Sequence, residues 1–389
     1  MNILIHTAAS PYENLPIGGA ETSLRLIAEL LALRGHKVYF ISKSKKISFK
    51  AVTMKVINGV DVILFHKYPN PLKIYKLDYL AGKRKKKYLE KLLINKEIEI
   101  VYTYYNLSLC KRYLKLKQSP EYNFKLVVRI AGMRWYEQIK VNESFKEVYH
   151  NLFEQADSLN FISEGLLLLY SDGLKELNMT SKSKHHFVKD IGVVEISEKR
   201  KGIAENAEET LNCVMVSRFS KYQKRQDILV EAVYLLNEEI PIHLTFVGEG
   251  PTKDILEKKV RKLGISEKIT FLPFLNQEAL WKTISQQNLV CHACNYEGLS
   301  KIIIESMAMG MPVLASDVLP LNLYIIDGKN GFLVANTAAE WAKKIETLYR
   351  QRRLFEKIGT AASVFIKANY DASINVLEYE KQFENLIKL

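Results

Sequence analysis

The chain has few cysteines, no long apolar run and no leader-like start. Four cysteines among 389 residues do not suggest a disulfide framework. No stretch reaches the roughly 18 consecutive apolar residues that a membrane-spanning helix needs. The first residues, Met-Asn-Ile-Leu-Ile-His-Thr, lack the basic start and the apolar segment of a signal peptide. These absences predict a cytoplasmic protein.

Length and apolar patterning predict two globular domains of the α/β class. The chain is longer than one compact core usually needs, and its 48% hydrophobic and 25% charged residues are typical of globular proteins. Apolar runs of strand length alternate with helical periods in both halves, which is typical of parallel sheets. Strands are predicted at residues 2–6, 38–41, 98–102, 125–130 and 156–163, and then at 212–217, 243–247, 269–272, 289–293 and 313–315. We expect two Rossmann-like domains that face a central cleft at the carboxyl ends of their strands.

Two carboxylates, Glu297 and Glu305, stand with seven residues between them in the second half. The first precedes a predicted helix, and the second lies on it. A helix start offers free backbone N–H groups to a phosphate, and a nearby carboxylate can accept hydrogen bonds from sugar hydroxyls. The pair therefore fits a nucleotide sugar, although two glutamates near an exposed helix are more often solvated.

Four further motifs occur in order around this pair. Gly18-Gly-Ala-Glu21 follows the first predicted strand, where two glycines permit close approach to a diphosphate and positive φ angles. Arg218 and Lys224 lie on a basic loop after the first strand of the second half. Gly248-Glu-Gly-Pro251 and Pro273-Phe-Leu275 follow the next two strands.

Taken together, the five elements resemble the retaining glycosyltransferase family 4, the glycosyl transferases group 1, whose signature is Glu-x7-Glu. The resemblance implies the GT-B architecture, with an acceptor-binding N-terminal domain at 1–195, a linker at 196–210, a nucleotide-sugar-binding domain at 211–364 and a helix at 365–389 that returns to the first domain. It implies transfer of a sugar, with retention of configuration, from a nucleoside-diphosphate sugar to a lipid-linked or polysaccharide acceptor in cell-envelope glycan synthesis. UDP-sugars are the favoured donors. No metal or other cofactor is expected, and no Asp-x-Asp motif is present.

The resemblance also assigns roles to residues. The catalytic residues are Arg218, Lys224 and Glu297. The two cations stabilise the departing diphosphate, and the carboxylate binds the transferred sugar. The donor-binding residues are Gly18, Gly19, Gly248, Phe274, Gly298, Leu299, Ser300, Lys301 and Glu305. The acceptor residues are Glu21, Arg134 and Trp135, with packing in the core as the alternative for Trp135.

One position departs from the family pattern. Many members have a histidine after the strand that matches residues 125–130, and this chain has Ala131. Either the contact is absent or a neighbour such as Arg134 supplies it. Two other functions therefore stay open: a nucleotide-sugar epimerase of the same fold, and a non-catalytic glycosyltransferase-like partner subunit.

Positive charge is concentrated in the first half. The net charge is +13, and residues 1–195 hold 31 Lys and Arg against 19 Asp and Glu, a net +12. Clusters occur at Lys43-Ser-Lys-Lys46 and at Lys83-Arg-Lys-Lys-Lys87, with tyrosines nearby. Such segments favour an anionic membrane surface, here the inner face of the cell membrane. No nucleic-acid-binding motif accompanies the charge, so nucleic acid is not the predicted partner.

The segment Cys291-His-Ala-Cys294 has the spacing of a redox or zinc site. It lies in an apolar run that is typical of a buried strand, and no second cysteine pair supplies further ligands. We therefore interpret these four residues as part of the core.

Overall fold

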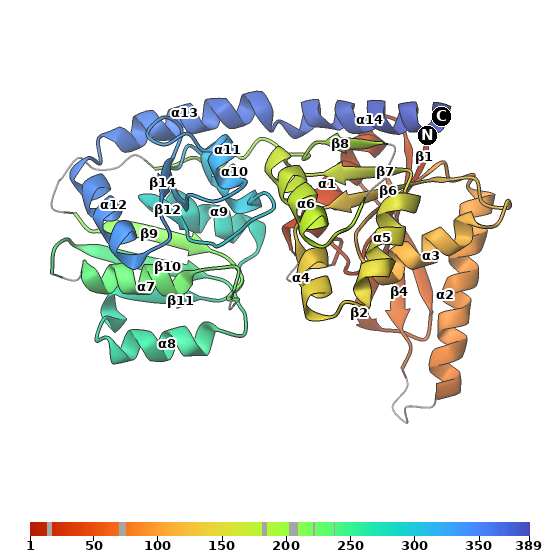
Figure 1. Ribbon diagram of the computed structural model, residues 1–389, viewed down its shortest axis with the longest axis horizontal. Coiled ribbons are helices and arrows are strands. Elements are labelled where there is room, and N and C mark those ends of the chain that lie inside the picture. The colour runs from red at the N-terminus through yellow and green to blue at the C-terminus, as the bar shows by residue number, and fades with distance from the viewer. Residues whose placement is uncertain (14–17, 70–74, 181–184, 202–208, 221, 237) are drawn as a thin grey trace. The chain divides into compact units, whose positions relative to one another are not determined.

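The computed structural model describes residues 1–389 except 14–17, 70–74, 181–184, 202–208, 221 and 237. The chain forms two compact units, one of Met1–Ile191 with Ala372–Leu389 and one of Gly192–Asp371. Each unit is a mainly parallel sheet with helices packed on it (Figure 1). Residues 202–208 of the predicted linker lie outside the described residues. The predicted α/β class with two Rossmann-like domains is confirmed.

The sheet of the first unit has the strand order β3-β4-β2-β1-β5-β6-β7-β8. Its strands pair in parallel, apart from the antiparallel pair of β3 and β4. The elements of the unit are β1 (Asn2–His6), α1 (Gly19–Leu33), β2 (Lys37–Ile47), β3 (Val52–Ile57), β4 (Val60–Lys67), α2 (Tyr75–Asn95), β5 (Ile100–Tyr104), α3 (Leu107–Lys117), β6 (Lys125–Ile130), α4 (Arg134–Val141), α5 (Phe145–Gln155), β7 (Ser158–Phe161), α6 (Glu164–Glu176), β8 (His186–Val188) and α14 (Ala372–Lys388).

The sheet of the second unit has the order β11-β10-β9-β12-β13-β14, and its strands are parallel. Counted along the chain, this is the order 3-2-1-4-5-6 of a Rossmann fold. The elements are β9 (Leu211–Val216), α7 (Gln226–Leu235), β10 (Ile242–Val247), α8 (Lys253–Lys262), the 3-10 turn η1 (Ser266–Lys268), β11 (Ile269–Leu272), α9 (Gln277–Ser285), β12 (Leu289–His292), α10 (Lys301–Ala308), β13 (Val313–Ser316), α11 (Leu321–Tyr324), β14 (Phe332–Val334), α12 (Ala338–Arg350) and α13 (Leu354–Asn369).

The central strands of the second unit are buried on both faces, which explains their continuous apolar sequences. All residues of β12 and β13 are buried. One core cluster packs α7, α8 and α12 on one side of the sheet, and another packs α9, α10 and the end of α13 on the other. The strand order reverses between β9 and β12, and ligands of such folds bind beyond the carboxyl ends of the strands at this reversal.

The predicted helix at 365–389 is two helices. α13 ends at Asn369 within the second unit, and α14 starts at Ala372 within the first. The helix breaks because the carbonyl of Tyr370 accepts a hydrogen bond from the backbone N–H of Val193 at 2.9 Å instead of from a following turn. α14 then packs its buried face, from Ala372 to Leu386, into the apolar core of the first unit.

The strands at 2–6, 125–130 and 269–272 occur where they were predicted, β2 extends well beyond the predicted 38–41, and the other predicted strands differ by one or two residues at one or both ends. The hairpin of β3 and β4 was not predicted. Among the residues that the structure describes, no helix is both long and apolar enough to cross a membrane.

Candidate active site

The loops after β9 and β12, at residues 217–225 and 293–300, lie alongside each other at the reversal of strand order. The backbone N–H of Arg225 donates to the carbonyl of Ala293 at 2.9 Å, and that of Asn295 donates to Gln223 at 2.9 Å. These bonds form a short antiparallel bridge between Lys224 and Cys294. The two loops, which are far apart in sequence, are thereby held side by side.

The bridge places Lys224 against Glu297. The ammonium and the carboxylate form an ion pair, and their side chains are only 11% and 13% exposed. Burial raises the pKa of the Glu297 carboxyl, but the charge of Lys224 and the hydrogen bond from His292 outweigh it and hold this pKa well below its usual range. Glu297 is therefore ionised at neutral pH, and the pair is charged.

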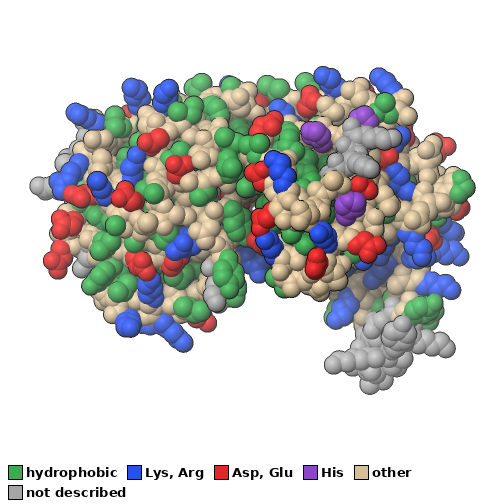
Figure 2. Space-filling view, viewed as in Figure 1, with side chains coloured by type: hydrophobic (Ala, Val, Ile, Leu, Met, Phe, Trp, Pro, Cys, Tyr) green, Lys and Arg blue, Asp and Glu red, His purple; other side chains and the backbone are tan. Residues whose placement is uncertain are grey.

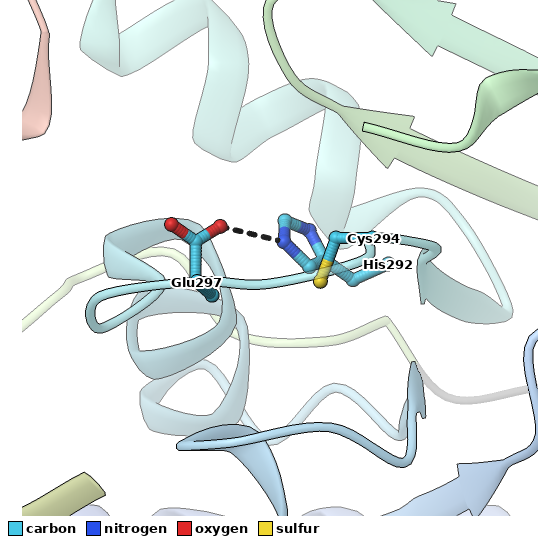
Figure 3. Close-up of side chains that lie close together, drawn as sticks. All are labelled: His292, Cys294 and Glu297. Atoms are coloured by element: carbon cyan, nitrogen blue, oxygen red, sulfur yellow. Dashed lines mark hydrogen bonds and ion pairs between the residues drawn. The ribbon is translucent and has the colours of Figure 1, made fainter. Parts of the chain in front are cut away.

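His292, the last residue of β12, lies beside the carboxylate of Glu297 (Figure 3). Its Nε2 is 3.1 Å from Oε2 of Glu297, 3.0 Å from Nζ of Lys224 and 3.3 Å from Oγ of Ser300. Burial, and then the positive charge of Lys224, lower the pKa of His292 to about 4. The imidazole is therefore neutral at physiological pH.

His292, Cys294 and Glu297 offer ligand atoms that lie within 4.8 Å of one another, as a metal site would require (Figure 3). The cation at this place is the ammonium of Lys224, which contacts both His292 and Glu297. Burial raises the pKa of the Cys294 thiol to about 12, so the thiol is neutral in this environment. The residues present thus fit a metal poorly, and the expectation that no metal is needed stays a prediction.

Glu305 lies in a different environment on α10. It is buried, and its Oε2 accepts hydrogen bonds from Gln277 Nε2 at 2.9 Å and from Trp281 Nε1 at 3.1 Å. Burial raises the pKa of its carboxyl, and Lys301, Trp281 and Gln277 lower it less than burial raises it. Of the two predicted carboxylates, one is thus pushed toward the ionised form and the other toward the neutral form.

The start of α10 has no side-chain cap. Ser300 occupies the N-cap position, yet its hydroxyl faces His292 and makes no capping hydrogen bond. The ammonium of Lys301 donates to the carbonyl of Gly192 at 2.7 Å, which turns this side chain away from the helix start. Gly298 and Leu299 complete the loop before the helix, which is buried at Gly298 and half-buried at Leu299.

Arg218, Gly248 and Phe274 follow β9, β10 and β11 and so belong to the same edge of the sheet. Arg218 is exposed, and its carbonyl accepts from Gln226 Nε2 at 3.1 Å. Phe274 is 43% exposed. Gly248 has a φ of 144°, and a Cβ there would lie 2.2 Å from the carbonyl oxygen of Ser217. Gly248 therefore permits close contact with the loop that carries Arg218.

The remaining predicted residues lie in the first unit, and two expectations for them are wrong. Trp135 is fully buried among Tyr149, Phe153 and Tyr170, so it packs in the core and does not contact an acceptor. Gly18 has an ordinary φ of −81°, and Gly19 is not among the glycines with positive φ.

Glu21 and Arg134 both lie near the phenol of Tyr104, at the end of β5. Burial and then Glu21 raise the pKa of this phenol, and Arg134 lowers it. Arg134 is exposed at the start of α4, and Glu21 is half-buried near the start of α1. Their acceptor-binding role stays a prediction.

Sequence reasoning missed His292, Gln277, Trp281 and Gln223 as parts of the site. His292 was interpreted as a core residue, and it is buried. Its position at the carboxyl end of a strand, where the cleft was predicted, was the signal that could have identified it. Gln277 and Trp281 lie on α9, and nothing in their own sequence indicates that they face Glu305.

The sequence of the second unit is similar to that of known glycosyltransferases. The family model described as glycosyl transferases group 1 matches residues 196–364. EpsD of Bacillus subtilis (strain 168), which is named a glycosyltransferase, is 34% identical over 138 residues, 35% of this chain and 36% of EpsD. The chain matches about a third of the length of such curated relatives. The resemblance to this family is confirmed over the second unit.

Solved structures resemble the whole chain. Sucrose-phosphate synthase from Thermosynechococcus elongatus has a TM-score of 0.82 at 19% identity, with 100% of this chain and 99% of that chain covered. HepE of Anabaena, in complex with UDP-glucose, has a TM-score of 0.76 at 16% identity, with 99% and 100% covered. At these identities the likeness shows the fold, and it confirms the predicted GT-B class.

Replacing Gly248 by alanine should destabilise the second unit, because the new Cβ would collide with the carbonyl of Ser217. Gly264→Ala is the matched control, since Gly264 also has a positive φ, of 69°, but no atom lies within 4 Å of its Cβ position. We expect Gly264→Ala to lower the free energy of unfolding by about 1–2 kcal/mol, and Gly248→Ala to cost about 1–3 kcal/mol more. Denaturant unfolding measures both, and equal losses would contradict the close contact.

Proposed function

Because residues 196–364 match the family model of the group 1 glycosyl transferases, we propose that the protein transfers a sugar from a nucleoside-diphosphate sugar to an acceptor. The transfer retains the configuration of the sugar. The observation that carries this proposal is the buried pair of Lys224 and Glu297 close to the start of α10, which no side chain caps. UDP-sugars are the preferred donors, a choice supported by the UDP-glucose in the related HepE structure. The acceptor is a lipid-linked or polysaccharide glycan of the cell envelope, and no metal is required.

Each group has a separate task in this proposal. The diphosphate lies at the start of α10, where free N–H groups and the helix dipole favour negative charge. Negative charge grows on the diphosphate as the bond to the sugar breaks, and Arg218 and Lys224 stabilise it. Glu297 accepts hydrogen bonds from hydroxyls of the transferred sugar, and Glu305 accepts them from the ribose.

Two other functions remain distinguishable by experiment. A nucleotide-sugar epimerase would convert the donor when no acceptor is present. A non-catalytic partner subunit, which Ala131 favours, would neither transfer nor hydrolyse a sugar. The charged state of Lys224 and Glu297 favours an enzyme over both a silent subunit and a purely structural role for these residues, because buried charges cost folding free energy.

Ligand binding tests the proposal directly. Purified protein is heated alone and with UDP, UDP-glucose, other nucleoside diphosphates and adenosine monophosphate as a control. A ligand at 100 times its dissociation constant adds about 2.7 kcal/mol of stability. We expect stabilisation by a nucleoside diphosphate and by its sugar conjugate, followed by sugar transfer in the presence of acceptor. No stabilisation by any nucleotide sugar would overturn the proposal.

Arg218→Ala and Lys224→Ala should each lower kcat about 100-fold or more, the effect of losing one preorganised electrostatic donor. Arg218 is exposed, so its removal should leave stability unchanged, whereas removal of Lys224 should also destabilise the fold because Glu297 stays buried. Arg261→Ala, an exposed cation on α8, is the control and should retain normal turnover. Near-normal kcat in both test variants would refute the assignment.

Removal of the two carboxylates should separate their tasks. Glu305→Ala should weaken both UDP and UDP-glucose about tenfold or more, and Glu297→Ala should weaken chiefly UDP-glucose, because each loses a hydrogen bond to a charged group. Calorimetric titration of both ligands measures this. The Gln variants keep the side-chain volume and serve where an Ala variant does not fold. Equal losses for both ligands in both variants would contradict this division.

The proposal includes a peripheral membrane partner for the first unit. In α2, the side chains of Lys83, Arg84, Lys86 and Lys87 are exposed. Figure 2 shows Lys and Arg side chains gathered at the lower right, over the region of α2. The edge strand β3 also exposes the apolar side chains of Met54 and Val56, and the end of β2 and the segment after it expose Ile47 and Phe49. Basic and apolar groups together suit an anionic bilayer surface.

Liposome co-sedimentation tests this partner. The protein should bind anionic vesicles and not neutral ones, and high salt should release it, because each exposed cation contributes on the order of 1 kcal/mol that salt screens. Changing Lys83, Arg84, Lys86 and Lys87 to Gln should strongly reduce binding. The control variant loses the same number of charges in the second unit and should bind normally. Its substitutions replace four exposed cations, namely Lys258, Arg261, Lys262 and Lys343. Equal binding to both vesicle types would disprove the membrane role.

A further inference from the structure

The carboxylate of Glu297 is held from four directions. Its Oε2 receives Lys224 Nζ and lies 3.1 Å from His292 Nε2. Its Oε1 accepts from the backbone N–H of Gly298 at 3.2 Å and from Gln223 Nε2 at 3.4 Å. These four contacts use the acceptor capacity of a carboxylate. A sugar hydroxyl that binds Glu297 must therefore replace one of them, and the longest is the bond from Gln223.

The hydrogen of the neutral His292 ring belongs on Nε2. Nδ1 is buried and has no hydrogen-bond partner among the described residues. A buried N–H without a partner is rarer in proteins than a lone pair without one. With the hydrogen on Nε2, the ring donates to Oε2 of Glu297 and cannot accept a hydrogen bond from Lys224, whose Nζ lies 3.0 Å from Nε2 and bonds to the same carboxylate oxygen. This contact between two donors is relieved when Lys224 turns toward another partner.

Lys224 cannot serve Glu297 and the diphosphate equally well. In the proposed reaction its ammonium turns toward the departing diphosphate, and Glu297 then loses its cationic partner while it stays buried. Leaving a buried charge without its partner is strongly unfavourable. A second donor at the same oxygen, already in place, lowers this penalty.

We propose that His292 is a positioning residue that holds the Glu297 carboxylate in place while Lys224 engages the diphosphate of the donor. The inference rests on the proposed function and deepens it, since it adds a group that touches neither the sugar nor the phosphate. Ser300 Oγ, 3.3 Å from Nε2, connects the same ring to the first turn of α10, where the diphosphate lies.

The test compares two amide substitutions. In His292→Gln the side-chain nitrogen reaches the position of Nε2 and can donate to Glu297, whereas in His292→Asn the amide reaches only the position of Nδ1. We expect His292→Asn to weaken both UDP and UDP-glucose about tenfold or more, the effect of losing one hydrogen bond to a charged group. His292→Gln should stay within about threefold of the unaltered protein.

A double variant shows whether His292 acts through Glu297. In the Glu297→Ala background, His292→Asn should cause no further loss of UDP affinity, because no buried carboxylate remains to be held. Additive losses would overturn the inference. The inference would also be overturned if His292→Asn bound UDP and UDP-glucose as tightly as the unaltered protein. This holds even if the substitution lowers the melting temperature. If the unaltered protein binds neither UDP nor UDP-glucose, the proposed function itself fails, and the inference falls with it.

Discussion

The ion pair of Lys224 and Glu297 is the interaction on which the site depends. Both groups are nearly buried, and removing either one would leave the other as a buried charge without its partner. The pair forms because the strand order reverses between β9 and β12, so that the two loops leave neighbouring strands and meet in one short antiparallel bridge. The fold therefore brings the two charged side chains together, and the ion pair depends on the bridge between the two loops.

Several polar contacts keep that bridge rigid. Ser316, at the end of β13, accepts from the backbone N–H of Cys294 at 2.9 Å and donates to Asn336 at 2.7 Å. Asn336 in turn donates to the carbonyl of Cys294 at 2.7 Å. Asn295 donates to the carbonyl of Tyr222 at 2.7 Å. Buried polar groups that are fully paired fix one arrangement, so the loop after β12 has one defined path past Lys224.

Local sequence predicted what depends on local sequence. Apolar runs identified the parallel strands, because strands buried on both faces need apolar side chains throughout. The motif order predicted Arg218, Lys224, Glu297 and Glu305 as site residues, and their roles stay predictions. The role of His292 depends on which strand lies beside β12, and that is decided by tertiary packing. Trp135 follows the same logic, since only the aromatic side chains around it show that it belongs to the core.

The two glutamates of the motif differ because their surroundings differ. An ammonium and an imidazole hold the pKa of Glu297 low, whereas burial raises the pKa of the Glu305 carboxyl more than Lys301 and the hydrogen bonds from Trp281 and Gln277 lower it. In the proposed reaction, the negative charge of Glu297 suits the positive charge that develops on the sugar. The carboxyl of Glu305, held by an indole and an amide, suits hydroxyls that bind and do not react. One sequence signature thus supplies two chemically distinct acceptors, and the side chains around them set the difference.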